Sequence, residues 1–485
     1  MQGNGTAANP YLVATAADLD SIRYLSPSAH YRQIADINLG GVQWTPILFG
    51  SYGFMGVYDG GGHKIAGLNL FSQSYEDEIG LFRRILHNPA QTVEIKNLTV
   101  AGNMTAYSGG LLVGLVASYS SSNTSWLKIT NCHVSGKINN ISGGTFGGLY
   151  GTNFSLGNQS MAITGCTAHI EISGNTGANI GGLIGNLSGA TGGKVEITNC
   201  AAYGKISFLP NAPWGDVGGL VAYALGDKCL ISECEANVDI SGGYWSGGLV
   251  GAIRTASQIE RCCATGSVSG NECTGGLIGY HGGWGVEVKN CYATGGVSIA
   301  AGGSGYYFGG LCGANAGAFV NCYAAGNVNA YNGVAGLCGY NSGVIQSSFA
   351  MSKAIVDIAP GYYPAGRVAS DQRGTLNAYA RSDMTYNGVV GGFPEFDPTL
   401  GGKDGQSITA EQARMRATYA AAGWDMSEAW DIVEGHTYPY LRSERNKIWV
   451  KQNGVIHRVR VPYAKAGDTK PCLAYAKQNG QIYQI

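Results

Sequence analysis

The sequence is poor in charge, in proline and in long apolar runs, and each shortage excludes a class of protein. Charged residues make up 13% of the chain and the formal net charge is −1. This near balance argues against a nucleic-acid binder that depends on a basic surface. The 45% hydrophobic content argues against intrinsic disorder. Proline occurs only 13 times and the glycines show no Gly-X-Y period, which excludes collagen. No run of about 18 apolar residues is present, so we expect no membrane span.

Catalytic signatures are also missing. The eight histidines lie outside any Gly-x-Ser-x-Gly motif, and no phosphate loop, nicotinamide fingerprint or His-Glu-x-x-His motif occurs. Glycoside cleavage needs two facing carboxylates about 5 to 10 Å apart. Glu94, Glu196 and Glu287 share one repeat position, but repeats without an acid separate them. We therefore expect no catalytic residue, metal ion or cofactor, and keep a polysaccharide-degrading enzyme as the alternative.

The N-terminal stretch "MQGNGTAANPYLV" lacks the basic and apolar regions of a secretory signal. We expect either that a signal was removed or that the protein reaches its site by another route. The chain has thirteen cysteines, an odd number, so they cannot all pair within one chain.

Glycine is abundant, with 78 of 485 residues, more than twice the ordinary usage of about 7%. The glycines belong to an internal repeat, which is clearest at one position. That position steps by 34 residues four times, then by 28, 29, 31 and 26. Its occupants are Leu98, Cys132, Cys166, Cys200, Cys234, Cys262, Cys291, Cys322 and Ser348.

A second repeated position belongs to a Gly-Gly-Leu-x-Gly motif, as in "FGGLYG" and "TGGLIG". Its leucines are read as Leu81, Leu115, Leu149, Leu183, Leu220, Leu249, Leu277, Leu311 and Leu337. Gly, Ser, Asn and Thr are poor helix formers, and apolar residues alternate in "VEITNCAA", which is strand periodicity. Each repeat is too short to bury its own apolar face, so the copies must stack. The sequence therefore predicts an all-β fold, a β-solenoid (parallel β-helix) of about nine coils.

The residue before the cysteine position is often asparagine, as at Asn97, Asn131 and Asn199. Asparagine tolerates the left-handed conformation, so we expect a bend with a partial asparagine ladder there.

The Gly-Gly-Leu-x-Gly units resemble the GLUG motif of bacterial surface proteins. "WTPI" (44–47) and "FMGVYDGGGHKIAGLNL" (54–70) look like the segment that opens such arrays. "GWDMSEAWDIVEGHTYPYLR" (423–442) looks like the segment that closes them. The resemblance covers roughly residues 3–442. It implies a β-solenoid of extracellular or appendage proteins, often called adhesins, and no established catalytic residues.

Four regions follow from these patterns: an N-terminal cap and opening segment (1–97), the repeats (98–356), a C-terminal cap (357–442) and a basic tail (443–485). Residues 15–23 read as a short helix with Thr15 as N-cap, and residues 409–423 as a helix with a Thr409–Gln412 capping box. Asn453-Gly454 and Asn479-Gly480 predict hairpins, and hence a small β-meander, in the tail.

The cysteine column cannot be a ligand set if leucine and serine replace it at its ends. We interpret Cys132, Cys166, Cys200, Cys234, Cys262, Cys291 and Cys322 as a reduced core ladder of small side chains. Stacked coils bring Cα atoms within disulfide range, so distance alone does not exclude oxidation.

Recognition of a ligand would fall to aromatic residues at coil corners, since tyrosine and tryptophan anchor interfaces. The candidates are Trp214, Trp245, Trp284, Tyr306 and Tyr307. They form a binding stripe if they share one side of the solenoid; the alternative is that each fills its own corner.

Together these features predict a non-enzymatic adhesion or receptor-binding rod, located extracellularly on a phage tail or a bacterial surface. The expected partner is a surface glycan or protein, with no nucleic acid. The basic tail could dock onto other virion or appendage proteins, and a homotrimer is expected by analogy with fibres. A structural spacer is a third alternative.

Overall fold

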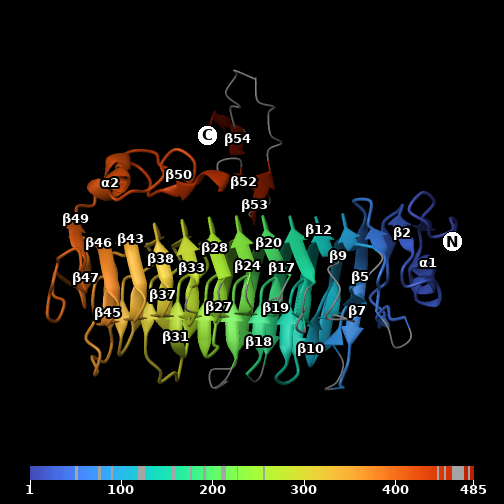
Figure 1. The fold of residues 1–485 in the computed structure, drawn as a ribbon, viewed down its shortest axis with the longest axis horizontal. Coiled ribbons are helices and arrows are strands. Elements are labelled where there is room, and N and C mark those ends of the chain that lie inside the picture. Colours follow the sequence, from blue (N-terminus) through green and yellow to red (C-terminus); the bar gives the residue numbers. More distant parts are fainter. Residues whose placement is uncertain are drawn as a thin grey trace. The chain divides into compact units, whose positions relative to one another are not determined.

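The computed structural model contains three long β-sheets, of 30, 9 and 10 strands, that stack coil upon coil (Figure 1). It describes residues 1–49, 53–74, 78–88, 91–117, 126–153, 159–174, 177–188, 193–208, 215–226, 228–254, 257–283, 285–444, 447–452, 455–460, 475–478 and 481–484. The chain divides into two compact units, Met1–Ala413 and Arg414–Ile485.

The first sheet consists of two ladders of mostly parallel strands, because each coil bends at the cysteine position. Two long strands near its C-terminal end run through the bend and pair in both ladders. The ladder before the bend contains β1 (Tyr11–Val13), β2 (His30–Gln33), β4 (Val57–Asp59), β8 (Val93–Lys96), β12 (Trp126–Thr130), β16 (Ser160–Thr164), β20 (Val195–Thr198), β24 (Cys229–Ser232), β28 (Ser257–Glu260), β33 (Glu287–Lys289), β38 (Ala318–Val320), β43 (Val344–Ala350) and β46 (Thr375–Arg381).

The ladder after the bend contains β3 (Ile37–Asn38), β5 (Lys64–Phe71), β9 (Thr99–Ala106), β13 (His133–Asn140), β17 (Thr167–Gly174), β21 (Ala201–Phe208), β25 (Glu235–Ser241), β29 (Cys263–Ala264), β30 (Val268–Gly270), β34 (Tyr292–Ala293), β35 (Val297–Ile299), β39 (Tyr323–Ala324), β40 (Val328–Ala330), β44 (Ala354–Asp357), β47 (Thr385–Tyr386), β48 (Val389–Val390) and β49 (Gln406–Ile408).

The second sheet contains β6 (Glu78–Ile79), β10 (Ser108–Gly110), β14 (Thr145–Gly147), β18 (Asn179–Gly181), β22 (Asp216–Gly218), β26 (Trp245–Gly247), β31 (Glu272–Gly275), β36 (Phe308–Gly309) and β41 (Val334–Ala335). The third contains β7 (Phe82–Leu86), β11 (Val113–Ala117), β15 (Tyr150–Asn153), β19 (Ile184–Ser188), β23 (Val221–Leu225), β27 (Val250–Ile253), β32 (Ile278–His281), β37 (Cys312–Asn315), β42 (Cys338–Asn341) and β45 (Ala369–Gln372).

The register matches the repeat in the sequence. Ile129 pairs with Ile163, and Met161 with Val195, each 34 residues along the chain. The predicted β-solenoid is therefore confirmed. One leucine assignment was wrong: Leu112, whose N–H donates to the Leu149 carbonyl, occupies the Gly-Gly-Leu column, whereas Leu115 pairs with Thr152.

The residue at the predicted bend has a left-handed backbone conformation. Asn97, Asn131 and Asn199 have φ values of 53°, 50° and 54°, and Glu233 and Arg261 at the same position have 54° and 51°. A non-glycine residue at positive φ carries a steric cost that asparagine bears most easily. The bend geometry therefore explains why asparagine recurs there.

The middle glycine position of the motif is set by packing across the core. A Cβ added at Gly248 would lie 2.0 Å from the Gly276 oxygen and 2.9 Å from the Ala264 Cβ. A Cβ added at Gly219 would lie 1.9 Å from the Gly248 oxygen, and one added at Gly276 would lie 2.2 Å from the Gly310 oxygen. The motif glycine of the next coil therefore leaves no room for a side chain at this position. Across the core, the alanine two residues after the cysteine, as at Ala236, Ala264 and Ala293, completes this contact.

The solenoid extends beyond the predicted repeat region of residues 98–356. β1, β2 and β4 pair in parallel before it, and β45, β46 and β49 continue the sheets after it. The final coils lack the cysteine and glycine signals but keep alternation: Leu376, Ala378 and Ala380 are buried. Burial of alternate residues thus suffices to continue the stack.

The N-terminal helix was predicted correctly. α1 (Ala16–Ser21) has Thr15 as N-cap, with the reciprocal Thr15–Asp18 capping box, and η1 (Ile22–Tyr24) follows. Leu19 and Ile22 are buried in the core of the first unit.

The predicted helix over 409–423 is interrupted. Thr409 and Gln412 do make reciprocal hydrogen bonds of 2.8 and 3.1 Å. Only the 3₁₀ turn η2 (Gln412–Arg414) follows, because Met415 is extended, and α2 (Arg416–Ala421) starts after it.

The second unit, described by itself, has α2, the 3₁₀ turn η3 (Arg442–Glu444) and the antiparallel pair β50 (Trp430–Asp431) and β51 (Tyr440–Leu441). Trp424 lies between Tyr419 and Trp430, with ring centroids 4.9 and 4.6 Å away. Two antiparallel hairpins follow, β52 (Lys447–Gln452) with β53 (Val455–Arg460) and β54 (Tyr475–Gln478) with β55 (Gln481–Gln484). The Asn-Gly pairs that predicted these hairpins lie outside the described residues.

Candidate functional site: an aromatic face

Two outward-facing columns of side chains meet where the second and third sheets join. In early coils they are polar: Asn179 Nδ2 donates to Asn186 Oδ1 at 3.0 Å, and Asn186 Nδ2 lies 3.4 Å from Thr145 Oγ1. The register continues the first column through Asp216, Trp245 and Glu272. The second column continues through Tyr223, Ala252, Tyr280, Ala314, Tyr340 and Asp371. From residue 216 onward the two columns gain aromatic side chains at Tyr223, Trp245, Tyr280 and Tyr340.

Trp245 and Tyr280 form the first aromatic cluster. Their rings stack with centroids 4.3 Å apart and an angle of 15° between planes. The Arg254 guanidinium carbon lies 4.8 Å from the Trp245 ring, 5.6 Å from Tyr280 and 6.0 Å from Tyr223. Cation–π contacts of this kind fix a flexible cation over rings. All three rings remain partly exposed.

Tyr307 is at the centre of the second cluster. Its ring centroid lies 5.2 Å from Tyr340, 5.0 Å from Tyr363 and 5.9 Å from Tyr306. Tyr307 has a φ of 72°, which is a strained conformation for a bulky residue. Tyr306 is 43% exposed and Tyr362, which contacts Tyr363, is 85% exposed. We call the set Tyr223, Trp245, Tyr280, Tyr306, Tyr307, Tyr340, Tyr362 and Tyr363 the aromatic face.

Charged groups border the aromatic face. Arg373 lies 5.4 Å from the Tyr340 ring and makes two hydrogen bonds to Asp371, of 3.0 and 2.9 Å. Burial raises the pKa of Asp216 to about 7, although the Arg254 charge opposes this. Burial and a hydrogen bond to Glu272 raise the pKa of Tyr244 to about 12. The face thus combines apolar rings with hydrogen-bonding groups.

Three of the five predicted aromatic residues lie on this face: Trp245, Tyr306 and Tyr307. Trp214 and Trp284 lie outside the described residues. The prediction missed Tyr223, Tyr280 and Tyr340. The signal was available, because each stands three residues after the motif leucine, at Leu220, Leu277 and Leu337.

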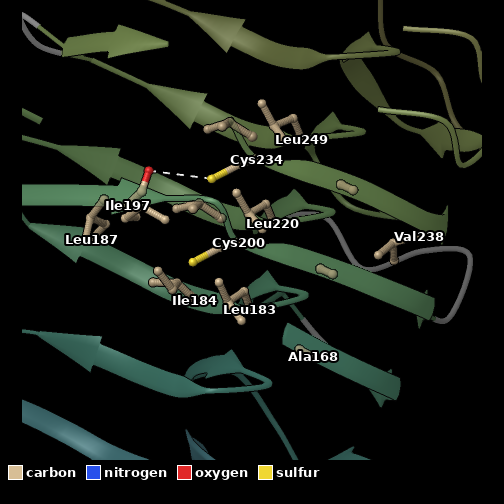
Figure 2. Packing of buried hydrophobic residues seen from close by; sticks show 14 of the residues in the cluster. Ala168, Leu183, Ile184, Leu187, Ile197, Cys200, Leu220, Cys234, Val238 and Leu249 are labelled. Carbon is tan, nitrogen blue, oxygen red and sulfur yellow. Dashed lines mark hydrogen bonds between the residues drawn. The ribbon is translucent and has the colours of Figure 1, made fainter. Parts of the chain in front are cut away.

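The cysteine column lies in the core, and Figure 2 shows Cys200 and Cys234 packed among buried apolar side chains. Cys132, Cys166, Cys200, Cys234, Cys262, Cys291 and Cys322 are free thiols and at most 2% exposed. Each thiol approaches a carbonyl of the preceding coil, as in the 3.5 Å contact of Cys234 Sγ with the Ile197 oxygen. The Cys262 N–H in turn donates to Cys291 Sγ, and the Cys322 N–H to Ser348 Oγ.

These contacts add a polar role to the predicted small-residue ladder, because the thiol or hydroxyl satisfies backbone groups at the bend. They also explain the serine at the end of the column. Burial raises the pKa of Cys166, Cys200 and Cys234 well above the usual range, which suppresses the reactive thiolate.

Within the described ranges, no group of three or more His, Cys, Asp or Glu side chains could hold a metal ion. The row that holds Glu94 and Glu196 has Lys128 and Ala162 between them. No helix in the described part of the chain is long and apolar enough to cross a membrane.

Comparison with known proteins gives one family match: residues 270–299 match the GLUG motif. This segment contains Glu272, Tyr280 and Cys291. A protein of Evansella cellulosilytica, named as a candidate Gly-rich membrane protein, is 36% identical over 120 residues. That match covers 23% of this chain and 13% of the relative.

Among solved structures, a candidate immunoglobulin A1 protease from Bacteroides ovatus aligns with 91% of this chain and 94% of its own, at 16% identity and a TM-score of 0.26. An IgA1 protease aligns with 82% of this chain and 26% of its own, at 14% identity and a TM-score of 0.38.

Proposed function

We propose that this GLUG-motif β-solenoid is a non-enzymatic extracellular binding protein, and that its aromatic face recognises a glycan on a cell surface. The observation that carries the proposal is the gathering of partly exposed rings on one face of adjoining coils. Soluble proteins seldom leave such rings exposed together without a partner.

The chemistry of the face suits sugars. Tyrosine and tryptophan rings offer flat apolar surfaces, and their polar groups remain available for hydrogen bonds. Arg373, Asp371 and Glu272 stand at the border, where they can reach sugar hydroxyls. A protein receptor would use the same rings, since tyrosine, tryptophan and arginine dominate protein interfaces as well.

The location that fits this proposal is a bacterial surface or a virion appendage. The extended stack of parallel coils would display the face away from an anchoring point. Docking of the basic tail onto appendage proteins and a homotrimeric assembly stay predictions, and sedimentation analysis of the purified chain tests the trimer.

Two exposed tyrosines provide the test. Tyr362 on the aromatic face is 85% exposed, and Tyr24 in the N-terminal cap is 79% exposed. We expect Tyr362→Ala and Trp245→Ala to weaken glycan binding, Trp245→Ala by about tenfold or more, as for an interface anchor. Tyr24→Ala should bind as the wild type does. The measurement is a glycan array followed by titration calorimetry.

Equal loss in Tyr24→Ala, or no effect of Trp245→Ala, would contradict the proposal. If the wild-type protein binds neither glycans nor cells, the spacer alternative is favoured.

One observation favours the enzyme alternative. Asp216 and Glu272 flank Trp245 in the same column, and their backbones are two coils apart, about 9.6 Å by the spacing of stacked strands. Two carboxyl side chains therefore project from one column, and a pKa of about 7 for Asp216 suits a general acid. Release of reducing sugar ends that both Asp216→Asn and Glu272→Gln abolish, with binding retained, would establish it.

A further inference from the structure

We infer that Arg254 forms an anion-binding subsite of the aromatic face, which selects a glycan bearing carboxylate or sulfate groups. This inference rests on the proposed function and specifies its ligand class.

Arg254 is held in place without being neutralised. The backbone N–H of Arg254 donates to the Ala224 carbonyl at 3.2 Å. Its exposed side chain lies over Trp245, Tyr280 and Tyr223. Within the described ranges its guanidinium makes no ion pair and no hydrogen bond. A guanidinium in this state keeps the planar fork of donors that binds carboxylate or sulfate through two hydrogen bonds.

Other arginines of the first unit show the contrast. Arg373 is paired with Asp371, Arg381 with Asp383, and Arg261 with Glu260 at 2.7 Å. Arg373 is the closest match to Arg254, because it also lies over a ring of the aromatic face. Its charge, however, is already satisfied by a carboxylate.

The carboxyl group that interacts with Arg254 is poorly suited to neutralise it. Asp216 forms no ion pair with Arg254, and its buried position raises its pKa to about 7. Burial therefore favours the neutral form of Asp216, so this carboxyl compensates the Arg254 charge only in part. The other titratable group that interacts with Asp216 is Tyr223.

The arrangement of rings indicates a chain-like ligand. Tyrosine recurs at every second coil of the second column, at Tyr223, Tyr280 and Tyr340, with Ala252 and Ala314 between them. The spacing of stacked strands puts successive tyrosine backbones about 9.6 Å apart. That interval is comparable to the length of a disaccharide in an extended glycan. A sugar chain along the column would bring an acid group within reach of Arg254.

A glycan accounts for these features better than a nucleic acid does. Nucleic-acid binding relies on many cations along a groove. This chain has a net charge of −1, and Arg254 is one cation among rings.

The experiment titrates the full chain with two matched pairs of polymers, polygalacturonate against its methyl ester and dextran sulfate against dextran. We expect the wild type to prefer at least one acidic member. Arg254→Gln should reduce that preference about tenfold, because the acidic member loses much more affinity than the neutral member. Arg254→Lys should keep part of the preference. Arg373→Gln should weaken the acidic and neutral members alike and so keep the preference. The pair that shows the preference identifies carboxylate or sulfate as the anion.

The inference is overturned if Arg254→Gln keeps the acid preference, if Arg373→Gln loses it equally, or if single-stranded DNA binds as tightly as the acidic polymer. Wild-type binding without acid preference overturns this inference alone. The proposed function fails separately, if Trp245→Ala has no effect on any glycan.

Discussion

The residue at the bend of each coil shows how one backbone angle governs the choice of side chain. Asparagine or glycine occupies the bend in several coils, but Glu233 has a φ of 54°. Glutamate gains no local hydrogen bond in this conformation, so it carries a strain of about 1 kcal/mol. Its ion pair with Arg261, at 3.4 Å and largely exposed, offsets little of that.

We therefore expect Glu233→Asn to stabilise the protein by about 0.5 to 1 kcal/mol, because asparagine tolerates the bend. The measurement is the midpoint of urea unfolding. Glu196→Asn is the matched control: it makes the same exchange within strand β20, where no positive φ is needed, and should not stabilise. A lower midpoint for Glu233→Asn would show that the ion pair outweighs the strain.

At the scale of elements, the close approach of neighbouring coils explains the motif glycines. Gly248→Ala would place a methyl group 2.0 Å from the Gly276 oxygen, which is backbone and cannot move aside alone. We expect a loss of about 3 kcal/mol or more in unfolding free energy. Gly296→Ala is the control, since its nearest atom would be 3.7 Å away. Equal stability of the two variants would mean that neighbouring coils separate easily at this position.

A buried row of polar side chains crosses four coils of the third sheet. His281 Nδ1 lies 2.6 Å from Asn315 Oδ1, Asn315 Nδ2 donates to Asn341 at 2.8 Å, and Asn341 donates to Gln372 at 2.9 Å. Burial lowers the pKa of His281 to about 4. The histidine therefore stays neutral in the folded protein over most of the acidic range.

This row predicts acid sensitivity. The unfolded chain protonates His281 near pH 6.5, whereas the folded chain does so only near 4. Protons therefore favour unfolding, and stability should fall by about 3 kcal/mol between these pH values. His281→Asn should remove this part of the pH dependence, and His436→Asn, at an exposed histidine, should not. Unfolding midpoints from pH 7 to 4 provide the measurement; identical profiles for wild type and His281→Asn would contradict the prediction.

At the scale of the whole molecule, each coil contacts mainly its neighbours, so stability should vary along the stack. Central coils, such as those with β23 and β27, are covered on both sides. The first coil, with β1, has a neighbour on one side only in its ladder. We expect amide hydrogen exchange to be slowest in the central coils and faster at β1 and β49. A single uniform exchange rate would instead indicate one cooperative unit.

The β-solenoid could be predicted from the sequence alone, because each coil repeats the same short sequence pattern. The bend asparagines, the Cys132 to Cys322 column and the motif glycines repeat with the coils and can be recognised without coordinates. The capping box at Thr15 and the hairpin positions are local in the same sense. The end of the stack was not predictable this way, since the last coils keep only buried alternation, as at Leu376 and Ala378.

Which side chains from different coils contact one another could be read only from the tertiary structure. The stacking of Trp245 on Tyr280 and the position of Arg254 over both depend on the register between β26, β27 and β32. The sequence separation of these residues reveals none of this. The hydrogen bonds of the cysteine thiols likewise follow from the bend geometry and not from the small size of cysteine. Repetition along the chain fixes the fold, whereas contacts between coils create the candidate site.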